Sequence, residues 1–462
     1  MMTLCGQYKT MKSLSPYRTT VASFSASKPR PSEAGLEYDS GEYILAMASL
    51  HDAGPPTSAG GADGGLAAAA LSDRSVAIYD ASGGTVLRTI GGAHDGPISG
   101  LRFVPGPGGG RGHRVVSSSR DGTCRVWDAA TGSLEATLRL GQEGEAALCL
   151  SVGYGGALCA VGTDRARISF FDLRPDGGGR PVGNLMGSYV DAHTEEVNAV
   201  RFEDVSDPQD PSKTKTVLAS AGEDGLAVIH DPSRPGEEEA LVSVLNAGAP
   251  LRRVDFFGPS MEGLCCLTGN ETASVHAWDA AQTVSDLGGA GLRRTLSDAV
   301  DAASGRGRAG NVDGGGEMSV EYLVGCSWAS LSPDQDRALH LLGGNSRGDG
   351  YLFRVDADRI SPALHLRGGH AGCIRDFCWI STPQGRRLIT GGEDARLCEW
   401  DPEGRVVAQS SSAFGSGGSR RGEQRAGGKV SGRSFIRDGL GGDSASKSKK
   451  KGKRGKKVGS PY

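Results

Sequence analysis

The sequence predicts an all-β fold, a seven-bladed propeller in which each blade is a small antiparallel sheet. The first observation is an internal repeat, and its clearest copy runs from Gly368 to Asp401. This copy holds three apolar runs typical of strands, separated by the turn-rich pieces STPQG and GGEDA, which is the composition of a short antiparallel meander. The second observation is the period, because repeats of roughly 40 to 45 residues with four short strands are the sequence form of propeller blades.

Polar residues recur at identical spacing in three copies of the repeat. A Ser or Thr stands four residues before an Asp, an aromatic residue or His stands six after that Asp, and a further His lies upstream. The three sets are His94, Ser117, Asp121 and Trp127; His193, Ser220, Asp224 and His230; and His370, Thr390, Asp394 and Trp400. This pattern strongly resembles the WD-repeat family.

Ser, His and Asp are also the members of a hydrolase triad, so the same residues invite a catalytic interpretation. A triad enzyme needs one nucleophile exposed beside an oxyanion hole, and it has no use for three identical constellations. The family resemblance implies a structural role instead. In WD-repeat proteins these four residues hydrogen-bond in series and tie the turn between the second and third strands to the loop before the first strand, which spares each buried group a desolvation cost of roughly 1 to 3 kcal/mol.

Taken in order along the chain, the propeller is expected to span residues 17–404. The seven blades are expected at about 43–90, 97–140, 146–189, 197–246, 251–300, 319–367 and 373–401. In the fifth blade Thr272 is placed at the position of the Asp, so that its polar set is incomplete. A polar, Gly-rich insertion at 301–316 cannot bury enough apolar surface to order itself. The sixth blade lacks the Trp–Asp mark, and alternation and spacing alone place it.

The amino terminus allows two interpretations. Residues 1–31 are basic, rich in Ser and Thr and free of acids, which suits an organelle targeting peptide. The competing interpretation makes residues 1–16 disordered and Tyr17–Ser25 a strand that pairs with the last blade and closes the ring, since a closed ring leaves no long exposed edge. We favour closure over organelle targeting.

The charge of the chain is unevenly distributed. From Pro402 onward there are 15 Lys and Arg against 4 Asp and Glu, a net of +11, which leaves −14 on residues 1–401 because the whole chain carries −3. We expect a disordered basic tail at 405–462. The basic run within it is either a solvated segment or a nuclear import signal that can also contact RNA weakly through its phosphates, and we favour the import signal. The signal consists of Lys447, Lys449, Lys450, Lys451, Lys453, Arg454, Lys456 and Lys457.

Several classes of function are not expected. The ten Cys are better interpreted as reduced thiols than as disulfides, because no secretory segment is visible. Without a CxxC pair at zinc-site spacing we expect no metal. The sequence also contains no phosphate-binding loop and no run of about 18 apolar residues, so we expect no cofactor, no small-molecule substrate and no membrane span.

The fold alone does not give the function. We expect a non-enzymatic scaffold for protein partners, a monomeric propeller within a larger complex, in the nucleus rather than the cytoplasm. Its partner-binding residues are expected beside the polar sets, at Asp95, Arg120, Thr194, Glu223, Ala371 and Glu393. Two alternatives stay open: a substrate receptor of a cullin-RING ubiquitin ligase, because FDLR ending at Arg174 is similar to a WDxR box, and an RNA-associated ribosome-biogenesis factor acting through the tail.

Overall fold

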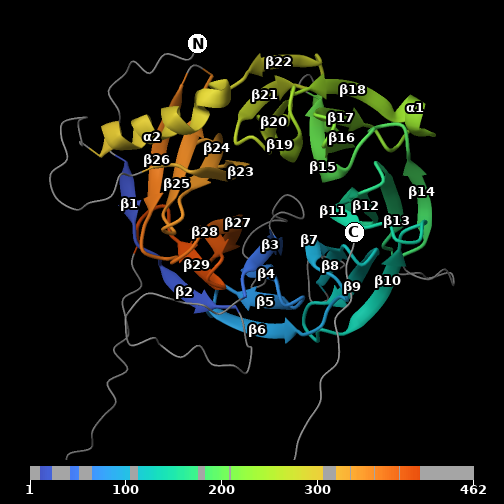
Figure 1. The fold of residues 1–462 in the computed structure, drawn as a ribbon, viewed down its shortest axis with the longest axis horizontal. Helices are drawn as coiled ribbons and strands as arrows, with labels where there is room; N and C mark the ends of the chain where they lie inside the picture. The colour runs from blue at the N-terminus through green and yellow to red at the C-terminus, as the bar shows by residue number, and fades with distance from the viewer. Residues whose placement is uncertain are drawn as a thin grey trace, which may run out of the picture. The chain divides into compact units, whose positions relative to one another are not determined.

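Seven antiparallel sheets stand side by side around a central channel, each with its first strand toward the channel and its last strand outward (Figure 1). The predicted seven-bladed propeller is confirmed. The computed structural model describes residues 11–22, 42–50, 65–104, 113–174, 183–207, 210–304, 319–332, 334–357, 359–383 and 385–405, all within one compact unit, Met1–Ala408. Most of the predicted Gly-rich insertion and the basic tail after residue 405, including the whole import signal, lie outside the described residues.

The first four blades follow the chain in order. The first contains β3 (Ile44–Ser49), β4 (Leu66–Leu71), β5 (Val76–Asp80) and β6 (Thr85–Ile90). The second contains β7 (Ile98–Val104), β8 (Arg114–Ser119), β9 (Thr123–Asp128) and β10 (Leu134–Arg139). The third contains β11 (Ala147–Gly153), β12 (Leu158–Thr163), β13 (Ile168–Asp172) and β14 (Leu185–Tyr189). The fourth contains β15 (Val197–Asp207), β16 (Asp210–Gly222), β17 (Leu226–His230) and β18 (Leu241–Asn246).

The fifth blade has the same four-strand order, and the sixth and seventh blades each include one strand from the amino terminus. The fifth contains β19 (Leu251–Phe257), β20 (Gly263–Thr268), β21 (Ala273–Ala277) and β22 (Gln282–Ser285). The sixth contains β23 (Tyr322–Ala329), β24 (Ala338–Gly344), β25 (Gly350–Val355), β26 (Ile360–Leu366) and, at its outer edge, β1 (Lys12–Leu14). The seventh contains β27 (Ile374–Thr382), β28 (Gly385–Gly392), β29 (Arg396–Trp400) and β2 (Arg18–Val21).

The second strands show why the sequence folds into blades. LAAAAL of β4, GLCCLT of β20 and ALHLLGG of β24 are almost continuously buried, because each blade packs against a neighbour on both faces. A short, continuous run of apolar and small residues is the expected pattern for a strand buried on both sides. The outer strands β6 and β10 instead carry several exposed residues.

The amino terminus closes the ring with two strands. β2 pairs antiparallel with β29 and occupies the place where the sequence suggested a closing strand, although residues 23–25 lie outside the described part of the chain. The expectation that residues 1–16 are disordered was wrong at Lys12–Leu14, since β1 pairs in parallel with β26 and buries Leu14. The reason is the outer edge of β26, ISPALHL, which has no charged residue to keep other strands away and is covered here by β1.

The extent of the fifth blade also needs correction. Its sheet ends at Ser285, and α2 (Leu292–Ala303) follows where the sequence analysis continued the blade to residue 300 and began an insertion at 301. The helix buries Leu292, Leu296, Ala299, Val300 and Ala303, a helical spacing that the neighbouring Gly-rich stretch obscured. A second, short helix, α1 (Glu237–Ala240), precedes β18.

Candidate functional site

The polar set of the second blade forms one continuous chain of hydrogen bonds. The indole N–H of Trp127 donates to Ser117 Oγ at 2.9 Å, Ser117 Oγ lies 2.7 Å from His94 Nε2, and His94 Nδ1 lies 3.0 Å from Asp121 Oδ2. With its proton on Nδ1, the imidazole accepts the serine proton and donates to the carboxylate. Asp121 also accepts the backbone N–H of Asp95 at 3.0 Å, so the set joins the loop before β7 to the turn after β8.

The seventh blade repeats this chain of hydrogen bonds in full, and the fourth repeats it with three of the four residues. In the seventh blade the contacts are Trp400 Nε1 to Thr390 Oγ1 at 2.8 Å, Thr390 Oγ1 to His370 Nε2 at 2.8 Å and His370 Nδ1 to Asp394 Oδ1 at 3.0 Å. In the fourth, His193 lies 2.8 Å from Ser220 Oγ and 3.1 Å from Asp224 Oδ2. His230, expected as the fourth member, does not complete the set.

His230 does not hydrogen-bond to Ser220 as the Trp of the other sets does, because its ring is shorter than an indole, and it packs against Tyr189 instead. Its ring centroid lies 4.6 Å from that of Tyr189, and within the described structure its Nδ1 has no hydrogen-bond partner. Burial, followed by the nearby His193, lowers the pKa of His230 to about 4. The residue is therefore a neutral ring in the core, packed at a tilt against Tyr189.

The Ser–His–Asp order in these sets is that of a hydrolase, but the environment is not. Ser117 is 0% exposed, and its oxygen already accepts the Trp127 indole proton, whereas a nucleophile must reach a substrate. Burial lowers the pKa of His94 below the ordinary range. Although burial opposes ionisation of Asp121, hydrogen bonds from Thr123 and from the Asp95 N–H hold its pKa at about 2. The arrangement ties a loop to a turn and leaves no open reaction site.

The fifth blade requires a correction of register. In both blades the pairing of the first strand with the second has a register shift near its start, between Ile98 and Gly100 in the second blade and between Leu251 and Arg253 in the fifth. The two blades can be aligned on this shift. This alignment places His276 at the position of Trp127 and Asn270 at that of Asp121, so Thr272 does not occupy the Asp position. The Trp–Asp pair at Trp278 looks like the mark of the other blades and suggested the wrong register. The Trp278 indole is not part of a polar set, since it donates to the Met261 carbonyl at 2.7 Å.

The residues expected to bind partners lie at one end of the blades, which we call the rim: the loops before the first strands and the turns between the second and third strands. In each of three blades a backbone hydrogen bond joins turn to loop, from Arg120 to Pro97 at 3.0 Å, Glu223 to Glu196 at 2.9 Å and Glu393 to Cys373 at 2.9 Å. Exposed side chains at the rim are those of Asp95, Arg120, Thr194, Glu223 and Ala371. Glu393 is half-buried and pairs with Arg375.

Arg174 lies apart from this group. It follows β13, a third strand that starts at the rim and runs to the opposite end of its blade. Its guanidinium folds back on Asp172, with Nε 2.9 Å from Oδ1, while two thirds of the side chain stays exposed. The structure therefore divides the residues nominated from the sequence between two ends of the propeller.

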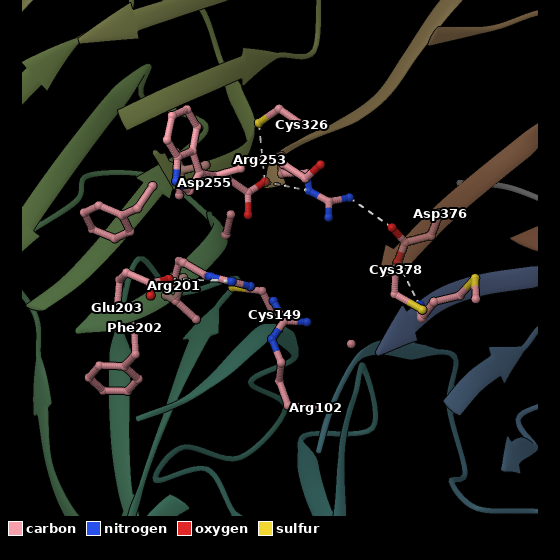
Figure 2. Close-up of a pocket in the computed structure, with 18 of the residues that line it drawn as sticks. Arg102, Cys149, Arg201, Phe202, Glu203, Arg253, Asp255, Cys326, Asp376 and Cys378 are labelled. Atoms are coloured by element: carbon pink, nitrogen blue, oxygen red, sulfur yellow. Dashed lines mark hydrogen bonds and ion pairs between the residues drawn. The ribbon is translucent and has the colours of Figure 1, made fainter. Parts of the chain in front are cut away.

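A channel of about 1300 Å³ runs through the ring, lined by the first strand of every blade. Arg253 of β19 crosses the sixth blade to reach β27, with Nη1 3.0 Å from Asp376 Oδ1 (Figure 2). It can do so because residue 325 is glycine, and a Cβ there would lie only 2.8 Å from Arg253 Nη1. Asp376 also accepts the backbone N–H of Met47 from the first blade at 2.7 Å, so one carboxylate joins three blades.

Further charged groups and a thiol line the channel. Figure 2 shows Arg102 and Arg201, from the second and fourth blades, extending toward Cys149 of the third. Arg201 pairs with Glu203 at 3.7 Å. These groups, together with Arg253 and Asp376, could not be predicted as a site from the sequence, since only the closed ring brings such distant residues together. The sequence did indicate that such ion pairs exist, because a charged residue within an apolar first strand needs a partner.

Other features of the described residues are simpler. They contain no group of three or more His, Cys, Asp or Glu side chains placed to hold a metal ion. Their cysteines are free thiols, most of them buried. No helix in the part of the chain that the structure describes is long and apolar enough to cross a membrane.

Comparison with known proteins supports the repeat pattern. The model of the WD domain, G-beta repeat, matches residues 84–128 and 362–401, two segments that contain the two complete polar sets. The chain contains WD repeats within a seven-bladed β-propeller. The resemblance seen in the sequence is thereby confirmed.

Relatives of this WD-repeat protein extend over most of its length. It is 27% identical over 336 residues to the WD repeat-containing protein 89 homolog of Dictyostelium discoideum, covering 72% of this chain and 79% of the relative. It is 26% identical over 300 residues to the WD repeat-containing protein GTS1 of Arabidopsis thaliana, covering 62% and 66%. A chain in the crystal structure of the mitotic checkpoint complex shares the fold with a TM-score of 0.53 at 15% identity, over 86% of this chain and 94% of that one.

Proposed function

We propose that this propeller is a non-enzymatic scaffold that binds protein partners through its rim. The observation that carries the proposal is the division between two kinds of polar residue. The Ser–His–Asp sets are buried and mutually bonded, whereas the residues directly beside them, such as Arg120 and Glu223, are exposed. WD-repeat propellers are typically platforms for protein interaction, and they present their contacts on exposed loops held by a rigid scaffold.

The rim is suited to protein partners because it is rigid and carries both signs of charge. Each turn is held by a backbone hydrogen bond and by the carboxylate of its polar set, so partner binding needs little further ordering. Arg120 lies among Glu223 and Glu393 around the ring, a mixture that favours an oppositely patterned protein surface over a nucleic acid. The propeller is expected to act as a monomer within a larger complex.

Charge reversal at the rim tests this proposal. Partners would be recovered with the full chain and with an Arg120→Glu, Glu393→Arg double variant, and Arg174→Ala at the opposite end would serve as control. The double variant should lose partners that the wild type and the control retain. Its melting temperature should change little, because exposed ion pairs such as Arg375–Glu393 contribute about 0 to 1 kcal/mol. Retention of every partner would place binding elsewhere.

The exposed Arg174 keeps the cullin-RING alternative testable. A substrate receptor of this kind would recover a cullin adaptor that an Arg174→Ala variant loses, while the rim variant keeps it. Phe171 stands where the WDxR box has Trp, and its side chain is buried in the core. Recognition would therefore rest on the arginine.

The basic tail supports the remaining two proposals, a nuclear location and an RNA contact. Replacing the eight basic residues between Lys447 and Lys457 by Ser and Gly should move the protein from the nucleus to the cytoplasm if they act as an import signal. An RNA contact through the same residues should weaken steeply as salt rises, with a slope of about 0.7 per neutralised phosphate for a single strand. An unchanged location, or binding insensitive to salt, would contradict the respective proposal.

A further inference from the structure

Two glutamates occupy the same position of the rim but have different neighbours. Glu223 precedes Asp224 in the turn of the fourth blade, and Glu393 precedes Asp394 in the turn of the seventh. Each carboxylate is contacted by the second residue of its own first strand. In the seventh blade that residue is Arg375, which forms an ion pair with Glu393, and in the fourth it is Asn198, whose Nδ2 donates to Glu223 Oε2 at 2.8 Å.

This difference decides the charge that each turn presents. Arg375 neutralises Glu393, whereas the amide of Asn198 orients Glu223 without compensating its charge. Asn198 is itself fixed, because Nδ2 also donates to the Leu251 carbonyl at 3.0 Å. Within the described residues Glu223 has no ion pair, so its carboxylate is held in one place with its negative charge intact.

Glu223 stands at the wall of a small pocket between the fourth and fifth blades. The pocket has a volume of about 280 Å³ and is lined by Asn198, Glu223, Pro250, Leu251, Arg252 and Gly269. Gly269 occupies the position that Arg120, Glu223 and Glu393 hold in their own turns, and a Cβ there would approach only the Pro250 carbonyl, at 3.9 Å. The missing side chain leaves the pocket open.

Arg252, the one cationic residue in the lining of this pocket, is already engaged. Arg252 pairs with Glu271 at 3.5 Å and donates to the Leu323 carbonyl of the next blade. The loop on the other side adds the exposed Glu195 and Glu196, so the surroundings favour a positive ligand. Pro250 provides an apolar wall along which the stem of a long side chain can lie.

We infer that this pocket receives a Lys or Arg side chain from the protein partner, with its cationic group on the Glu223 carboxylate and its stem against Pro250. The inference rests on the proposed function, since it assumes that partners dock at the rim. It adds the chemistry of the partner: a basic side chain long enough to enter the gap left by Gly269. A preorganised acceptor of this kind contributes to specificity as well as affinity.

Peptides selected on the full-length protein provide the probe. A random peptide library would be panned on immobilised wild-type protein, and the affinities of the recovered peptides would be measured by fluorescence polarisation. The variants are Glu223→Gln, which removes the charge; Gly269→Leu, which fills the pocket and leaves the charge; and Glu135→Gln, the control, which removes an exposed carboxylate from the outer strand β10, away from the rim. All three positions are at the surface, so each variant's melting temperature should stay near that of the wild type.

The expected result is a set of peptides with one fixed Lys or Arg. Replacing that residue by norleucine or citrulline should weaken binding to the wild type by about tenfold, and should have little further effect on Glu223→Gln, because the two changes remove the same interaction. Gly269→Leu should weaken binding similarly, and Glu135→Gln should not. The inference is overturned if the recovered peptides lack a fixed basic residue, or bind Glu223→Gln and Gly269→Leu as well as wild type.

The rim variant separates the two possible failures. If the peptides are lost in Arg120→Glu, Glu393→Arg but tolerate Glu223→Gln and Gly269→Leu, partners dock at the rim without using this pocket, and only the present inference falls. If the peptides tolerate all of these variants, the rim is not the docking surface and the proposed function falls with it.

Discussion

Tyr79 of the first blade donates its hydroxyl to the carboxylate of Glu399 in the last blade, a hydrogen bond across the seam where the ring closes. Glu399 is 0% exposed and also pairs with Arg387 at 2.8 Å. The amino terminus joins the same cluster, because Arg18 lies 3.6 Å from the Glu399 carboxylate and the ring of Tyr17 lies 3.8 Å from the Arg387 guanidinium. Burial and the neighbouring carboxylate raise the pKa of Tyr79, so it remains a donor.

Tyr79→Phe should therefore weaken the seam. The change removes one donor from a buried carboxylate and should lower the free energy of unfolding by about 1 to 3 kcal/mol. Chemical denaturation of Tyr79→Phe beside Tyr43→Phe, a half-exposed tyrosine, would measure this. Equal stability of the two variants would mean that the seam is held by other contacts.

Truncation of the amino terminus tests the two closing strands. Deleting residues 1–27 removes β1 and β2, exposes the edges of β26 and β29 and takes away Arg18 and Tyr17, so the melting temperature should fall by several degrees. Deleting residues 1–10 leaves both strands and should change it little. If the 27-residue deletion melts like the full chain, or if mass spectrometry finds a mature protein that begins beyond Val21, the segment serves targeting and not closure.

Most of the blades and the positions of the three polar sets could be predicted from the repeat, because the members of each set lie at fixed distances along a short stretch of the sequence. The spacing of Ser117, Asp121 and Trp127 is fixed by one turn and one strand, and the same local geometry recurs at Thr390, Asp394 and Trp400. His230 kept the spacing but lost the hydrogen bond, since spacing fixes the position of a ring and not its reach.

Other features depend on long-range contacts and were not predictable in this way. β1 has three residues and a parallel partner far along the chain, and Arg253 meets Asp376 only after the fifth and seventh blades are placed around Gly325. The pocket beside Glu223 likewise depends on a missing side chain in the next blade. Helix α2 was within reach of the sequence, because its buried residues repeat at helical spacing.

Gly325→Val should disrupt the bridge across the channel. A branched side chain would occupy the path of the Arg253 guanidinium and push it from Asp376, with an expected loss of about 1 to 3 kcal/mol in unfolding free energy. The loss should shrink when Arg253→Met is added, because the displaced group is then gone. Additive effects in this double-mutant cycle would show that Gly325 and Arg253 act independently.

His230 should make the propeller sensitive to mild acid. Its folded-state pKa of about 4 lies below the ordinary value of 6.5, so the unfolded chain binds the proton first. Stability from this residue is complete above pH 6.5 and is lost as the pH falls toward 4, by about 2 kcal/mol at pH 5. His230→Phe keeps a ring against Tyr189 and should reduce the loss of unfolding free energy between pH 7 and pH 5 by that amount. An unchanged pH dependence would contradict the assignment.

Asp121→Ala tests most directly whether the buried polar sets build the propeller while exposed rim residues bind its partners. Unfolding in denaturant should show a loss on the order of 2 kcal/mol, because the change leaves the buried His94 without its carboxylate partner. Asn270→Ala, at the equivalent exposed position of the fifth blade, should stay within about 0.5 kcal/mol of the wild type. At a temperature where it is folded, Asp121→Ala should still recover the rim partners; unchanged stability together with loss of partners would contradict a structural role.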